Sequence, residues 1–173
     1  MLVGLTYPPT EVLPKETAEK EEKTKKVKDR KAFLEDIGYS ESRNDYTKVN
    51  KYGYLGKYQF SRATLRLLGI KVTKEEFLNN YQLQEDAMFL LLVANKKNLR
   101  KEIKKYSGTT IKGIVVTESG ILAAAHLVGS GKVKRWLKTN GKKTKKDALG
   151  TSIESYMRKF GGYDINLPGT VKV

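Results

Sequence analysis

The segment from Ser119 to Val128 reads SGILAAAHLV and decides the fold class. It is apolar on nearly every side at helical spacing, which is typical of a buried central helix. Its small side chains let neighbouring helices approach closely. Upstream, Gln82 to Lys105 is predicted to be the longest helix, because one face of it is apolar. That face carries Met88, Leu91, Leu92, Leu99 and Ile103. We therefore expect a mainly helical domain around the central segment.

Helix-start signals lie on both sides of these two helices. They are found at Ser61, at Thr73 with Glu76, and at Thr151 with Glu154. The last two have the spacing of a reciprocal capping box. Gly69 is expected to end the first of these helices, and Gly161 with Gly162 the last, after Phe160. No internal repeat and no convincing long strand is visible.

A further helix is predicted from Ala32, where Phe33, Leu34 and Ile37 recur at helical spacing. Gly38 offers a stop, so this helix is expected to end just before Tyr39. The stretch from Asn44 to Gln59 is rich in glycine, asparagine and tyrosine and predicts a loop or a small hairpin.

The chain divides into three parts by composition. Residues 1–31 are predicted to form an extended arm with three prolines, followed by a charged helix or tether. Residues 32–165 form the α-helical domain, and residues 166–173 a C-terminal tail. The arm is a candidate for docking on another protein.

Composition limits the chemistry. The 173 residues hold 34 Lys and Arg against 19 Asp and Glu, a formal charge of +15 that favours a polyanionic partner such as nucleic acid, acidic lipid or wall polymer. With no cysteine and one histidine, thiol chemistry is excluded, and we expect no metal site or cofactor. No stretch is apolar enough for a membrane span, and no secretory signal is visible.

Five of the ten tyrosines lie within twenty residues, at Tyr39, Tyr46, Tyr52, Tyr54 and Tyr58. A phenol offers a flat apolar face and a polar tip, which suits sugar rings. The same tyrosines could instead stack on nucleobases. They could also simply fill the interior of a small subdomain.

Two carboxyl groups stand at the start of this tyrosine-rich region. Glu41 follows an apolar helix, and a carboxyl group at the mouth of a partly apolar pocket can keep its proton and act as a general acid. Asp45 follows one helical turn later. On the residues alone, Glu41 could equally be a surface glutamate near a helix end.

Four motifs occur in a fixed order along the chain. They are Glu41-Ser42, Gly56-Lys57-Tyr58-Gln59-Phe60, Ala124-Ala125-His126-Leu127-Val128-Gly129 and Tyr156-Met157-Arg158-Lys159-Phe160. Between about Phe33 and Phe160 the chain thereby resembles the soluble lytic transglycosylases, which carry Glu-Ser, Gly-Leu-Met-Gln, Ala-Ala-Tyr-Asn-Ala-Gly and a late Tyr-Val. It is also similar to lysozyme-like enzymes of phages.

The resemblance implies a lysozyme-like α+β fold and a role for each matching residue. Glu41 would be the catalytic acid, supported by a hydrogen bond from Ser42. Substrate would be contacted by Tyr54, Tyr58, Gln59, His126 and Tyr156, although the family has tyrosine at the place of His126. A hydrolase would need a second carboxylate or an ordered water, and Asp45 and Glu118 are the candidates. Glu118 also fits a helix start.

The expected function is cleavage of the MurNAc-GlcNAc linkage of peptidoglycan, as a muramidase or a lytic transglycosylase. We expect a phage virion or lysis protein that reaches the wall from the virion or the host cytoplasm. The alternative is a non-catalytic protein of the same fold that binds glycan or nucleic acid by its basic face. The segment from Lys132 to Lys146, with eight basic residues and Trp136, is a candidate for that face or a solvated loop between two helices.

Overall fold

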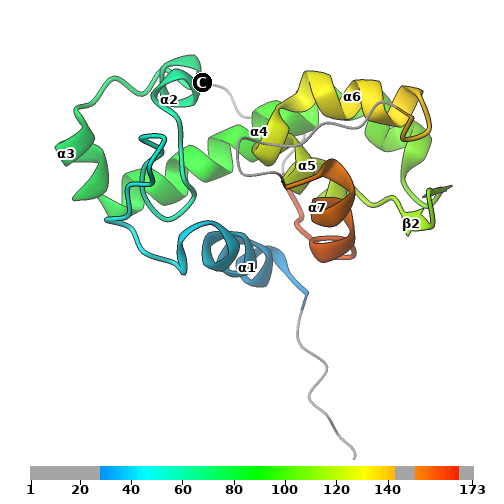
Figure 1. The fold of residues 1–173 in the computed structure, drawn as a ribbon, viewed down its shortest axis with the longest axis horizontal. Coiled ribbons are helices and arrows are strands. Elements are labelled where there is room, and N and C mark those ends of the chain that lie inside the picture. The colour runs from blue at the N-terminus through cyan, green and yellow to red at the C-terminus, as the bar shows by residue number, and fades with distance from the viewer. Residues whose placement is uncertain (1–27, 143–150, 168–173) are drawn as a thin grey trace, which may run out of the picture.

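A computed structural model describes residues 28–142 and 151–167, and these form a mainly α-helical fold (Figure 1). The elements are α1 (Arg30–Ser42), α2 (Arg62–Leu67), α3 (Lys74–Leu78), α4 (Tyr81–Tyr106), β1 (Thr110–Ile111), β2 (Ile114–Val115), α5 (Glu118–Val128), α6 (Ser130–Lys138) and α7 (Ile153–Lys159). No helix of the described part is long and apolar enough to cross a membrane. The predicted arm up to residue 27 and the end of the tail lie outside the described residues.

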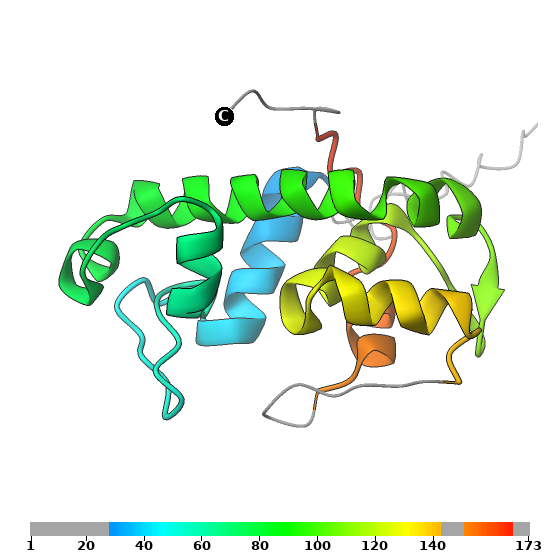
Figure 2. The same cartoon turned by 90° about the horizontal axis from the view of Figure 1, so that it is seen from above.

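The long helix α4 runs along one edge of the molecule, and the other helices lie together on one side of it (Figure 2). Helix α4 contacts α3, α5 and α6, and in Figure 2 α3 lies at its N-terminal end while α5 and α6 lie along its C-terminal half. Helix α5 is buried from Ser119 to Ala125, as its apolar sequence predicts, and packs against α7. The close approach of α5 to α7 depends on Gly120, where an added Cβ would lie 3.1 Å from the Met157 carbonyl oxygen.

Several predicted element boundaries are confirmed. Ser61 caps α2 by accepting a hydrogen bond from the Thr64 amide, and Thr73 and Glu76 form the reciprocal capping box of α3. Helix α4 extends the predicted range by one residue at each end. The loop that follows α1 holds only isolated bridges, Val49 with Leu55 and Leu55 with Phe60.

Three boundary predictions are wrong. Helix α1 starts at Arg30 and continues through Gly38 to Ser42, because Gly38 serves close packing rather than termination. An added Cβ there would lie 2.6 Å from the Lys57 Cε atom. Helix α7 is capped by Ser152, which accepts from the Ser155 amide, and not by Thr151.

The first part of the basic segment, from Lys132 to Lys138, lies in helix α6 and not in a loop between two helices. Trp136 is fully buried there, and its Nε1 donates a hydrogen bond of 2.8 Å to Glu154. The segment is therefore anchored through an apolar face, and its residues 143–146 lie outside the described part. The only two-stranded sheet of the described residues, β1 with β2, follows α4 and was not predicted.

Candidate functional site

Glu41 lies in the last turn of α1, where the chain leaves the helix. The helix ends because Arg43 and Asn44 adopt left-handed backbone conformations, with φ of 67° and 62°. The Arg43 amide donates to the carbonyl oxygens of Gly38 and Tyr39, which closes the final turn. The Glu41 side chain is only 14% exposed, so its carboxyl group is largely removed from solvent.

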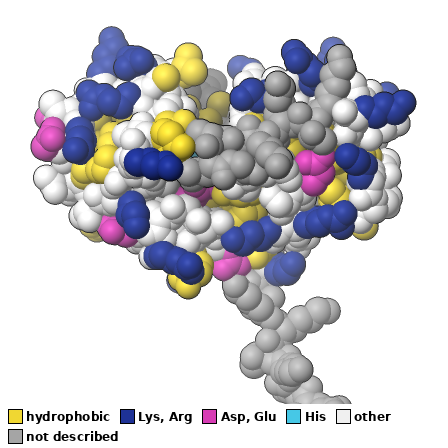
Figure 3. All heavy atoms as spheres, in the orientation of Figure 1, with side chains coloured by type: hydrophobic (Ala, Val, Ile, Leu, Met, Phe, Trp, Pro, Cys, Tyr) yellow, Lys and Arg dark blue, Asp and Glu magenta, His cyan; other side chains and the backbone are white. Residues whose placement is uncertain are grey.

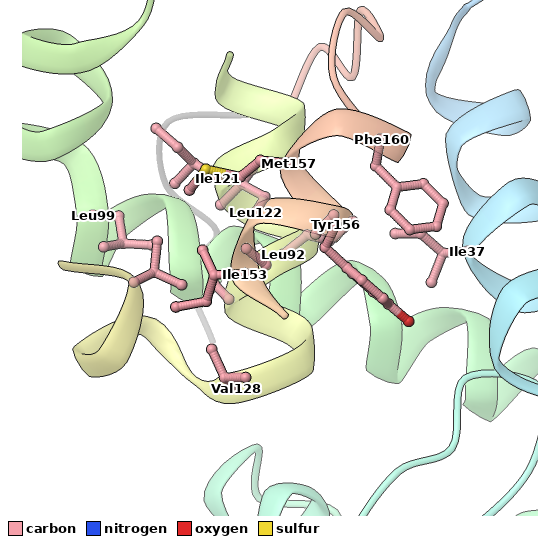
Figure 4. Close-up of a cluster of buried hydrophobic side chains, with 14 of the residues drawn as sticks. Ile37, Leu92, Leu99, Ile121, Leu122, Val128, Ile153, Tyr156, Met157 and Phe160 are labelled. Carbon is pink, nitrogen blue, oxygen red and sulfur yellow. The ribbon is translucent and has the colours of Figure 1, made fainter. Parts of the chain in front are cut away.

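Two groups from other helices approach one oxygen of this carboxylate. The hydroxyl of Tyr156, on α7, donates a hydrogen bond to Glu41 Oε1. His126 Nε2, on α5, lies 3.9 Å from the same oxygen. The Tyr156 ring is held by Phe160, with ring centroids 5.0 Å apart, and its hydroxyl points out of the apolar cluster in Figure 4. Among the described residues, no group makes a hydrogen bond to Oε2.

His126 is nearly buried, with a 7% exposed side chain. Burial lowers the pKa of the imidazole, and this effect exceeds the opposing influences of Glu41 and of the Tyr58 backbone. Its Nδ1 atom is buried without a hydrogen-bond partner in the described part of the chain. The ring packs edge-on against Phe60 at 6.0 Å. His126 therefore lies beside Glu41, and its burial favours the neutral imidazole.

The buried histidine predicts a pH-dependent stability. Because the folded pKa lies below the ordinary 6.5, the unfolded chain takes up a proton at higher pH than the folded chain. Stability is full above about pH 6.5 and falls as the pH drops below it, by up to about 1.4 kcal/mol per pH unit. Urea unfolding between pH 7.5 and 5.5 measures this slope.

His126→Gln is expected to remove the slope in that window, since this is the only histidine of the chain and carboxylates titrate mainly below about pH 5. Equal slopes for wild type and variant would contradict the assignment.

Ser42 does not support Glu41 as the resemblance implied. It is buried, its hydroxyl donates to the Lys57 carbonyl oxygen at 2.8 Å, and its oxygen accepts from the Asp45 amide at 3.0 Å. These bonds join the end of α1 to the following loop. Ser42 therefore holds that loop, because its single hydroxyl proton is donated there and not to Glu41.

The loop residues predicted to contact substrate take different positions. Tyr58 is fully buried, and its hydroxyl donates to Glu85 Oε2 at 2.7 Å, so its side chain belongs to the core. Gln59 is half-buried, and its amide donates to the Gly56 carbonyl oxygen at 2.8 Å. Tyr54 is half-buried near the loop tip. No hydrogen bond in the described part joins any of the three to Glu41.

No hydrogen bond or ion pair of the described residues joins either candidate second carboxylate to Glu41. Asp45 is exposed and accepts hydrogen bonds from the Thr47 amide and hydroxyl, which lower its pKa. Glu118 lies at the N-terminal end of α5 and pairs with Lys96 at 2.8 Å. Glu118 lies eight positions before His126, which corresponds to about 12 Å along the helix.

Sequence reasoning missed a buried charge cluster behind the site. Lys57 is 1% exposed, and its Nζ atom contacts Glu35 at 2.8 Å, Glu85 at 3.0 Å and the Tyr46 hydroxyl at 3.3 Å. Burial alone would raise the pKa of Glu85, but hydrogen bonds from Tyr58, Tyr46 and Lys57 outweigh it and lower that pKa. The cluster joins α1, the loop and α4. The lysine inside the Gly-Lys-Tyr-Gln-Phe motif was its only sequence signal.

The described residues contain no group of three or more histidine, cysteine, aspartate or glutamate side chains able to hold a metal ion. The site is centred on the largely buried carboxylate of Glu41. Its Oε1 atom accepts a hydrogen bond from Tyr156 and lies near the His126 imidazole. Comparisons with protein-family models, with curated proteins and with solved structures find no match for this chain.

Proposed function

We propose that the protein cleaves the glycan strands of peptidoglycan, with Glu41 as the general acid. One observation carries this proposal. Glu41, His126 and Tyr156 come from three segments far apart in the sequence, and their side chains meet at one largely buried carboxylate oxygen. A lone surface glutamate at a helix end would not need such partners. A lysozyme-like arrangement of the helices is part of the same proposal.

The two carboxylate oxygens have different roles in the proposed mechanism. Oε1 is occupied by the Tyr156 hydroxyl, so Oε2 carries the proton. Oε2 gives that proton to the oxygen that links MurNAc to GlcNAc, and the bond to the muramoyl C1 breaks as positive charge develops on the ring. The released GlcNAc hydroxyl keeps the proton, and Glu41 is left ionised.

The ionised Glu41 then takes a proton back from the nucleophile. If the muramoyl 6-hydroxyl attacks C1, a 1,6-anhydro ring forms and water is not consumed. If water attacks, a reducing end forms. We favour attack by the muramoyl 6-hydroxyl, with Glu41 alone as acid and then as base, because Asp45 is bonded to Thr47 and Glu118 is paired with Lys96.

The test is incubation of purified sacculi with the full chain, followed by mass spectrometry of the soluble products. Muropeptides that end in 1,6-anhydro-muramic acid are the expected result. Products with reducing muramic ends would support a muramidase instead. Sacculi that release no glycan fragments at any pH between 5 and 8 would overturn the proposal.

A second candidate function is binding of a polyanion without turnover. Figure 3 shows basic side chains spread over the visible face, with few acidic ones between them. On the C-terminal half of α4, five exposed basic residues form no ion pair within the described part of the chain. They are Lys97, Arg100, Lys101, Lys104 and Lys105. Duplex-DNA binding that weakens steeply with salt, together with intact sacculi, would favour this function.

For the cellular setting we propose a virion-associated or lysis-related protein that acts at the bacterial wall. The charge of the chain supports contact with anionic wall components. Other virion proteins are the proposed partners of the N-terminal arm.

A further inference from the structure

The tip of the loop between α1 and α2 is a tightly hydrogen-bonded turn. The Asn50 side-chain oxygen accepts from the backbone amides of Tyr52 at 2.9 Å and Tyr54 at 3.0 Å. The Gly53 amide donates to the Asn50 carbonyl oxygen, and the Asn50 amide to that of Tyr54. These four bonds fix the backbone of the tip before any ligand arrives.

The tip presents aromatic rings beside a cation. Tyr52 is 47% exposed, and its ring centroid lies 6.3 Å from that of Tyr54. The Lys51 ammonium group lies 5.1 Å from the centre of the Tyr52 ring. An exposed aromatic face next to a positive charge suits a sugar ring that carries a carboxylate.

The base of this loop adjoins the candidate acid. The Phe60 ring, near the end of this loop, packs edge-on against His126 at 6.0 Å, and His126 Nε2 approaches Glu41. Leu55 pairs with Phe60 through two backbone hydrogen bonds, of 2.9 and 2.8 Å, so Tyr54, the residue before Leu55, lies close to that contact. In Figure 2 the loop projects from the C-terminal end of α1, which carries Glu41. An extended glycan held at Glu41 can therefore reach the tip.

We propose that Lys51, Tyr52 and Tyr54 form a subsite for an acidic amino sugar. The sugar ring stacks on Tyr52, Tyr54 supports that ring from the side, and Lys51 pairs with the carboxylate of the lactyl group or of a short stem peptide. The subsite deepens the proposed function and rests on it, because it gives a preference for muramic acid over neutral amino sugars. Tyr52 supplies affinity, and Lys51 supplies selectivity.

The test measures binding in the full chain with Glu41→Gln, so that no turnover interferes. The ligands are a tetrasaccharide of alternating GlcNAc and MurNAc and the neutral tetrasaccharide of GlcNAc. Tyr52→Ala is expected to weaken both by about 10-fold, and Tyr52→Phe to bind as the parent does. Lys51→Gln is expected to weaken only the acidic ligand, by about 3- to 5-fold, and to reduce the salt dependence of its binding.

Tyr39 and Arg43 provide a matched control. Tyr39 is 53% exposed, and the Arg43 guanidinium lies 4.5 Å from its ring centre. Tyr39 is two residues from Glu41 on a helix and so points about 200° away from it. Tyr39→Ala should leave both dissociation constants within about twofold of the parent.

Equal binding by Tyr52→Ala and the parent, or an equal loss in Tyr39→Ala, would overturn the subsite. Sacculus cleavage by the wild-type chain reports on the proposed function separately. If the wild-type chain cleaves sacculi but Tyr52→Ala binds the oligosaccharides as the parent does, the subsite is overturned and the proposed function is not. Tyr52-dependent binding of the acidic ligand without cleavage overturns the catalytic proposal and supports the subsite.

Discussion

Glu41→Gln is expected to lower the rate of sacculus cleavage by about 10²- to 10⁴-fold, the usual contribution of a general acid. Glutamine keeps a carbonyl oxygen that can accept the Tyr156 hydroxyl bond, so the local packing is preserved. It cannot donate a proton to the glycosidic oxygen. The release of soluble muropeptides over time measures the effect, and an unchanged thermal midpoint shows that the fold is retained.

The matched control is Glu75→Gln, which makes the same change of charge on the exposed N-terminal turn of α3. We expect wild-type cleavage from this variant. A Glu41→Gln protein that clears sacculi at the rate of Glu75→Gln would show that the acid lies elsewhere. In that case the proposal for Glu41, Tyr156 and His126 as one site would fail.

Sequence patterns predicted the elements whose causes are local. The apolar spacing of α4 and α5 and the caps at Ser61 and Thr73 depend on residues within one or two turns, and the structure confirms them. The proximity of Glu41, His126 and Tyr156 was indicated only by the ordered motifs of the resemblance. None of these residues carries a local signal that would place it beside the others.

The errors arise where a long-range contact decides the outcome. Gly38 resembles a helix stop, but the Lys57 side chain crosses it closely and the helix continues. Ser42 resembles a partner for the neighbouring carboxylate, but the carbonyl oxygen of Lys57, fifteen residues later, takes its hydroxyl. The burial of Lys57 was not predicted from the sequence. Its burial depends on Glu35 and Glu85, which no local pattern pairs with it.

Substitutions at two glycines of the same loop can separate two contributions to stability. One is the strain of a left-handed backbone, and the other is the crowding of an added side chain. Gly53 and Gly56 both have left-handed conformations, with φ of 76° and 72°. An added Cβ at Gly53 would meet nothing within 4 Å, whereas at Gly56 it would lie 2.0 Å from Gln84 Oε1. Gln84 is fully buried and bonded to the Lys57 amide and to the carbonyl oxygens of Tyr46 and Phe77. It therefore cannot move aside without breaking these bonds.

Gly53→Ala is expected to lower the free energy of unfolding by about 1–2 kcal/mol, the cost of a left-handed alanine. Gly56→Ala adds the displacement of the Gln84 amide and the loss of buried hydrogen bonds, for a total of about 3–5 kcal/mol. Urea unfolding of both variants at pH 7.5 gives the difference directly. Losses of unfolding free energy that agree within about 0.5 kcal/mol would mean that the Gln84 side chain moves aside at little cost. Gly56 would then be required only for its left-handed backbone conformation.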